Sequence, residues 1–173
     1  TLTFHSVYAQ PNLIFSEQKT PMGSSVKKYN GKQVVVQANG QDVPVDEAMT
    51  ADVINDSWCT ELLLTAGENG NVKLSEAPAT IGDALCYELV VTLGSNEVKR
   101  YYDAKTGLCV RQSQVAQTPQ GDQVINVDFS DYKAVDGISV AHSMKVPLQP
   151  GMDLEVKTIS VTINGEVDKN IFN

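Results

Sequence analysis

The sequence predicts a mainly β protein, an antiparallel and strongly curved sheet with a short helix against its concave face. Apolar and polar residues alternate with a period of two along most of the 173 residues, which is the pattern of half-buried strands. Short turn sequences rich in glycine and asparagine separate these segments, and short turns join antiparallel neighbours. A long open sheet aggregates through its edges, so we expect it to curl or be covered.

The first part of the chain contains four predicted strands. They cover residues 1–8, 13–19, 24–29 and 32–38. Two Asn-Gly pairs, Asn30-Gly31 and Asn39-Gly40, are typical of hairpin turns in which both central residues have positive φ. These turns predict that each strand pairs with the next one along the chain.

One segment breaks the alternation and predicts a helix. Pro44 stops the preceding strand, and Asp46 is a suitable N-cap for a helix over 48–57. Its apolar side would carry Met49, Val53 and Ile54. The apolar character continues over 58–64, which predicts a second short helix or an irregular segment.

Strands return after a glycine-containing loop at 67–70. The predicted ranges are 85–93, 97–103, 108–116, 124–132, 138–146 and 154–163. In the last of these the apolar residues change phase, and a β-bulge near Thr158 would explain the change.

Composition excludes some classes of partner. The 21 acidic and 13 basic residues give a formal charge of -8, whereas nucleic acids and anionic membrane surfaces require a basic face. No apolar run approaches the ~20 residues of a transmembrane helix. The chain opens at Thr1 in a strand-like pattern, so we expect it to be a fragment of a longer exported chain.

Catalytic and metal-binding patterns are weak, and we predict a protein that is not an enzyme and holds no cofactor or metal. His5 and His142 belong to no zinc motif, and turn formation explains the aspartates near Tyr132 better than a cation site does. The three cysteines, Cys59, Cys86 and Cys109, lie among apolar residues, where free thiols are common. One pair could still form a disulfide in an oxidising compartment.

Binding of an apolar ligand is the remaining hypothesis. Strands with one apolar face can line a cavity for small hydrophobic molecules, although the same residues could equally form a packed core. The candidate cavity residues are Leu85, Leu89, Val91, Val110, Val127, Ile138, Val140 and Met144.

Several segments resemble, in order, motifs of LolA-like proteins, the lipoprotein carrier and sorting proteins of the Gram-negative periplasm. The segment YYDAKTGL at 101–108 is similar to their Y-x-D-x-x-T-G-L hairpin, and DYKAVDGI at 131–138 is similar to D-Y-x-x-V-D-G-I. Further similar segments are PNLIF at 11–15, YNGK at 29–32, IGDALCYEL at 81–89 and INGEVDKNIF at 163–172.

The resemblance implies a single domain over 1–173, shaped as an incomplete, half-open β-barrel with one or two short helices over the concave face. Its open mouth would hold acyl chains of lipids or lipoproteins, and Met49, Val53 and Ile54 would belong to a lid. The protein would then be a periplasmic carrier that transports lipids or sorts outer-membrane lipoproteins.

An alternative comes from related domains fused behind insulinase-type zinc peptidases of Bacteroidetes-like bacteria. Those domains carry no catalytic residues. The chain would then be an accessory or interaction domain of a larger exported protein, and its partners would include other domains of that chain.

Overall fold

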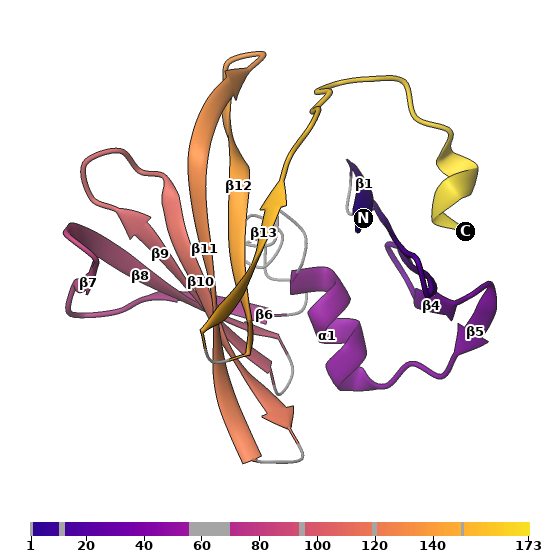
Figure 1. Cartoon of the computed structure of the whole chain (residues 1–173), viewed down its shortest axis with the longest axis horizontal. Coiled ribbons are helices and arrows are strands. Elements are labelled where there is room, and N and C mark those ends of the chain that lie inside the picture. Colours follow the sequence, from indigo (N-terminus) through magenta and orange to yellow (C-terminus); the bar gives the residue numbers. More distant parts are fainter. Residues whose placement is uncertain (1, 11–12, 56–69, 94–95, 119–120, 150) are drawn as a thin grey trace. The chain divides into compact units, whose positions relative to one another are not determined.

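The computed structural model describes residues 2–10, 13–55, 70–93, 96–118, 121–149 and 151–173. This part of the chain is mainly β, with antiparallel sheets and an α-helix (Figure 1). The chain divides into two compact units: unit 1 comprises residues 1–71, 93–96 and 167–173, and unit 2 comprises residues 72–92 and 97–166. The single domain expected over 1–173 would include both units, and it stays a prediction.

Unit 1 contains a five-stranded sheet in which each strand pairs with its neighbour along the chain. The strands are β1 (Thr3–Ala9), β2 (Leu13–Thr20), β3 (Gly23–Asn30), β4 (Val34–Ala38) and β5 (Gln41–Val43). Between β4 and β5, Asn39 and Gly40 have φ of 52° and 78°, which confirms the predicted hairpin turn with two positive φ values.

The other Asn-Gly turn differs from the prediction. Gly31 has a positive φ of 85°, but Asn30 does not share it, because Asn30 acts through its side chain. Its Oδ1 accepts hydrogen bonds of 3.1 Å from the backbone N–H groups of both Lys32 and Gln33. This Asx-type turn lengthens the connection, and β4 therefore begins at Val34 rather than at residue 32.

Helix α1 (Glu47–Asn55) covers one face of the five-stranded sheet. Asp46 Oδ1 accepts a hydrogen bond of 2.8 Å from Met49 N, which confirms the predicted N-cap. The buried Val53 packs in one cluster with Ile14, Tyr29 and Val36 of the sheet, and Met49 and Ile54 pack against the same cluster. The segment 58–64 lies outside the described residues.

The 3-10 helix η1 (Lys169–Phe172) contacts strands β2 and β3 of the same sheet. Lys28 Nζ donates a hydrogen bond to the backbone oxygen of Asn173. Lys28 neighbours Tyr29, whose side chain lies on the α1 face, so strand alternation puts the lysine on the opposite face. Unit 1 therefore has α1 on one face of its sheet and η1 against β2 and β3 on the other, where Phe172 is only 2% exposed.

The second sheet has the order β13-β12-β11-β10-β9-β8-β6, with the short β7 paired to β8 (Figure 1). Its strands are β6 (Gly70–Leu74), β7 (Ala79–Ile81), β8 (Ala84–Leu93), β9 (Asn96–Asp103), β10 (Cys109–Thr118), β11 (Gly121–Val135), β12 (Ile138–Gln149) and β13 (Met152–Lys157). From β8 onward each strand pairs with the next, as the short turns predict.

The last strand ends earlier than the sequence predicts. The sequence predicts a strand over 154–163, but β13 ends at Lys157, and Thr158 adds one more hydrogen bond, from its N–H to His142 O. Beyond it Ile159 is 91% exposed, so its apolar character does not reflect a buried strand face. The register shift of this strand pair lies on β12 between Pro147 and Gln149, not near Thr158.

We predict that Phe172→Ala destabilises unit 1 strongly. Removing a fully buried phenylalanine leaves a cavity and costs about 3–5 kcal/mol. Urea denaturation followed by circular dichroism should show a clear decrease in the free energy of unfolding. Met22→Ala, at a side chain that is 95% exposed, is the control and should change it by less than about 0.5 kcal/mol. Equal effects of both substitutions would contradict the packing described for η1.

Candidate functional site

One face of the larger sheet is polar and carries a row of alternating charges. The register aligns Arg111 with Asp128, Asp128 with Lys145, and Lys145 with Glu155. Directly opposed residues of antiparallel strands lie on the same face, so these four side chains form one row across β10 to β13. Arg111 binds Asp128 with two parallel hydrogen bonds, Nε to Oδ1 at 2.5 Å and Nη2 to Oδ2 at 2.9 Å.

The polar character of this face continues to β8 and β9. Glu88 Oε1 accepts a hydrogen bond of 2.7 Å from Ser75 Oγ and lies 3.6 Å from Lys99 Nζ. The hydrogen bond from Ser75 is the main cause that lowers the pKa of Glu88, and Tyr101 and Lys99 contribute. Burial, followed by the hydrogen bond to Glu88, raises the pKa of Tyr101. Ser113, in register with Lys99, donates a hydrogen bond to Asn126 Oδ1.

The opposite face is mostly apolar. Phe129 is in register with Met144, and Met144 with Val156, so these three side chains form a row across β11 to β13. The same alternation assigns further apolar residues to this face, and we call the set the apolar face: Val98, Ile125, Val127, Phe129, Met144, Val146, Leu154 and Val156. The two sides of the sheet therefore differ in chemistry, although the register also places Gln114 and Lys133 on the apolar side.

The structure brings most of the predicted cavity residues to the apolar face. Register places Val127 and Met144 there, and alternation along β12 adds Ile138 and Val140. On β8, Glu88 belongs to the polar face, so its odd-numbered neighbours point to the apolar side: Leu85, Leu89 and Val91. Val91 is fully buried, whereas Leu85 is 54% and Ile138 is 38% exposed.

Val110 is the exception among the eight. The β9–β10 register shifts between Cys109 and Arg111, and Val110 is the residue inserted at this irregularity. A bulged residue has no direct partner, so the pairing assigns Val110 to neither face.

The predicted lid residues belong to a different unit from the predicted cavity residues. Met49, Val53 and Ile54 are in unit 1, and all eight cavity candidates are in unit 2. Val53 is 1% exposed and packs on the unit 1 sheet. The lid role of this helix stays a prediction.

Sequence reasoning missed two polar residues of the apolar face, Arg100 and Gln112. They are in register with each other, and Gln112 is in register with Val127. Arg100 is only 7% exposed, and its Nε donates a hydrogen bond of 3.2 Å to Gln112 Oε1. The available signal was the alternation of Val98, Arg100 and Tyr102, which puts the arginine in the phase of a buried valine.

The histidines and aspartates take structural positions. His5 makes an edge-to-face contact with Phe15, and His142 Nδ1 lies 2.9 Å from Val140 O. Asp131 pairs with Lys133, and Asp136 has the positive φ of a turn residue. Within the described ranges no cluster of three or more His, Cys, Asp or Glu residues could hold a metal ion.

Two of the three cysteines can be placed. Cys86 is buried and Cys109 is half-buried, and neither takes part in a disulfide in this structure. Burial, with a contribution from Asp103, raises the pKa of the Cys86 thiol. A raised pKa keeps the reactive thiolate scarce at neutral pH. Cys59 lies outside the described residues.

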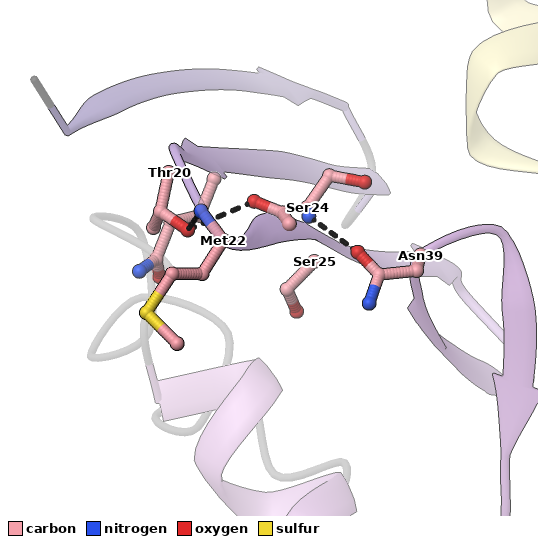
Figure 2. Close-up of a pocket in the computed structure, with 7 residues that line it drawn as sticks. Thr20, Met22, Ser24, Ser25 and Asn39 are labelled. Atoms are coloured by element: carbon pink, nitrogen blue, oxygen red, sulfur yellow. Dashed lines mark hydrogen bonds between the residues drawn. The ribbon is translucent and has the colours of Figure 1, made fainter.

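A depression of about 200 Å³ lies at the turn between β2 and β3 (Figure 2). Its polar groups are used within the turn: Thr20 Oγ1 bonds to Gly23 O and Met22 N, and Asn39 Oδ1 accepts from Ser24 N. A Cβ on Gly23, which has φ of +151°, would lie 2.2 Å from Asn39 Oδ1. The polar groups around the depression therefore stabilise the turn itself. None of the predicted cavity residues lines the depression.

Comparison with known proteins shows a structural likeness. The chain is similar to the crystal structure of a LolA superfamily protein from Nitrosomonas europaea, with 10% sequence identity and a TM-score of 0.54, over 99% of this chain and 87% of that chain. The fold of the chain is thus similar to that of this LolA superfamily protein. No protein-family model matches the sequence, and no curated protein matches it. Within the described residues, no helix is both long and apolar enough to span a membrane.

We predict that the protein loses stability between about pH 10 and pH 12 as the half-buried Tyr132 ionises. Tyr132 donates a hydrogen bond to Cys109 O, and burial raises its pKa to about 12. Because the folded state holds this proton more tightly than the unfolded state, its stabilising contribution is complete below pH ~10 and is lost as pH rises through the folded pKa.

Chemical denaturation at pH 9 and pH 11.5 would measure the effect. Tyr132→Phe should be less stable than the parent at pH 9, because it lacks the hydroxyl. It should also lose less stability between the two pH values. An unchanged pH dependence in Tyr132→Phe would show that other groups cause the alkaline loss.

Proposed function

We propose that this protein is an exported, non-catalytic carrier that binds acyl chains of lipids or lipoproteins on the apolar face of its larger sheet. The observation that carries the proposal is the segregation of the two faces, a charged row on one side and apolar rows on the other. The LolA-superfamily fold supports it, because that likeness extends over 99% of the chain. A half-open barrel formed by the whole chain and a periplasmic location complete the proposal.

The apolar face suits a flexible hydrocarbon ligand. Phe129, Met144 and Val156 offer a continuous row of apolar side chains, and methionine adapts easily to ligands of irregular shape. Each methylene group of an acyl chain that leaves water contributes roughly 0.8 kcal/mol. Affinity would therefore increase with chain length, without any reacting group.

The polar face would keep the protein soluble while an acyl chain is bound on the apolar face. The alternating charges from Arg111 to Glu155 neutralise one another across the strands instead of building one strong field. In the proposed arrangement α1, with Met49, Val53 and Ile54, would act as a lid over the acyl chain.

A second candidate function, an interaction domain of a larger exported protein, is favoured by one observation. Val115 and Val124 are cross-strand partners on the otherwise polar face, and they are 60% and 65% exposed. An apolar pair of this kind can contact another protein surface. The two functions differ in whether the purified chain binds lipid.

We predict that Met144→Glu abolishes acyl-chain binding, because a carboxylate in the apolar row next to Phe129 and Val156 would have to lose its hydration. Native mass spectrometry of the purified protein with added fatty acids, followed by organic extraction, would measure the bound lipid. Ser139→Glu is the matched control, since Ser139 is on the same strand, is exposed, and points to the other face.

The parent and Ser139→Glu should carry lipid, and Met144→Glu should carry none. If the parent binds neither fatty acids nor acylated peptides, the carrier proposal is wrong and the interaction domain becomes the better description. Equal lipid binding by all three proteins would instead move the acyl-binding site away from this face.

A further inference from the structure

Three Asn-Gly pairs lie wholly within the described residues: Asn30-Gly31, Asn39-Gly40 and Asn164-Gly165. In such a pair the backbone nitrogen of glycine can attack the side-chain amide carbon of asparagine, because glycine has no Cβ to obstruct the approach. The new N–Cγ bond closes a succinimide ring, and the Cγ–Nδ2 bond breaks as ammonia leaves with the proton of the glycine N–H. Water then opens the ring to aspartate or isoaspartate, so the reaction needs no other reactant.

The two pairs in unit 1 have asparagine side chains that are held by hydrogen bonds. Asn39 Oδ1 accepts a bond of 2.8 Å from Ser24 N, and Asn39 N donates one of 2.8 Å to Ser24 O. Asn30 Oδ1 accepts bonds of 3.1 Å from the N–H groups of Lys32 and Gln33. These pairs connect β3 with β4 and β4 with β5, so strand pairing constrains the backbone on both sides.

Asn164 differs from both of them. It follows β13 outside the helices and strands, and Asn164 and Gly165 are both exposed. Within the described ranges no hydrogen bond or ion pair holds the side chain of Asn164. The chain bends closely at this point, since Asn164 has φ of 55° and a Cβ on Gly165 would lie 3.0 Å from Thr162 Cγ2. The bend therefore favours a small residue at position 165, and the asparagine amide beside it is unrestrained.

We propose that Asn164 is a site of spontaneous deamidation, and that it reacts before Asn30 and Asn39. To close the ring, the side chain must turn toward the backbone nitrogen of the next residue. At Asn30 and Asn39 this movement breaks the hydrogen bonds of a turn between paired strands. The loss of one hydrogen bond slows a reaction by up to about tenfold. At Asn164 the same movement breaks no bond to any described residue.

The product would change the charge of the segment that connects β13 with η1. A carboxylate at position 164 joins Glu166 and Asp168, and an isoaspartate also inserts a methylene group into the main chain. Asp168 is the N-cap of η1, where its Oδ1 accepts a hydrogen bond of 2.9 Å from Asn170 N. The modification would therefore lie just before the helix that buries Phe172 in unit 1, and it does not depend on lipid binding.

Peptide mass spectrometry of aged protein tests this inference. The folded parent is incubated at mildly alkaline pH, samples are digested at acidic pH, and the converted fraction is measured for each Asn-Gly peptide. We expect Asn164 to convert about tenfold faster than Asn30 or Asn39, with both aspartate and isoaspartate as products. The protein incubated in urea is the reference, and there the three sites should react within about twofold of one another, since no turn holds any of them.

Gly165→Ala is the matched variant, because its Cβ obstructs the attacking nitrogen. It should slow conversion of Asn164 several-fold in both the folded and the unfolded chain, and leave Asn30 and Asn39 unchanged. Three outcomes would each overturn the inference: no conversion of Asn164 in the folded protein, conversion of Asn30 or Asn39 at an equal or higher rate, or an unchanged rate at Asn164 in Gly165→Ala.

Discussion

The structure depends on one constraint, that opposed residues of antiparallel strands must lie on the same face of the sheet. A shift of one residue in any pairing would exchange the two faces. The bidentate bond from Arg111 to Asp128 and the alignment of Lys145 with Glu155 favour the observed register in unit 2. The same register sends Arg100 and Gln112 to the apolar side.

Local chemistry explains which parts of the fold the sequence predicts well. Asp46 caps α1 as expected, and Asn39-Gly40 forms the expected hairpin, because both signals depend only on neighbouring residues. The Asn30 turn differs because a side chain competes with the backbone for two N–H groups. The strand expected beyond Lys157 is wrong, because pairing with β12 stops after Thr158 although β12 extends back to Ile138, and Ile159 is then exposed.

The candidate site shows where single-strand patterns reach their limit. Alternation is enough to group Val140 with Met144 on one strand, but grouping either with Val127 requires the register between strands. Only the register shift beside Val110 shows that the pairing does not assign it to the apolar face with the other predicted cavity residues. The structural likeness to the Nitrosomonas europaea protein at 10% sequence identity also reflects patterns rather than individual residues. A pattern of alternation and turns can persist while individual residues change.

The packing of η1 has a consequence for the order in which the protein folds. The sheet of unit 1 is made from the first 43 residues, yet one of its faces is closed by Phe172 and by the bond from Lys28 to Asn173. Because synthesis and folding proceed from the N-terminus, unit 1 cannot be completed until the whole of unit 2 has emerged. Strands β1 to β5 are thus made before β6 to β13, yet their sheet receives η1 only after them, and until then its uncovered face is a surface on which a chaperone can act.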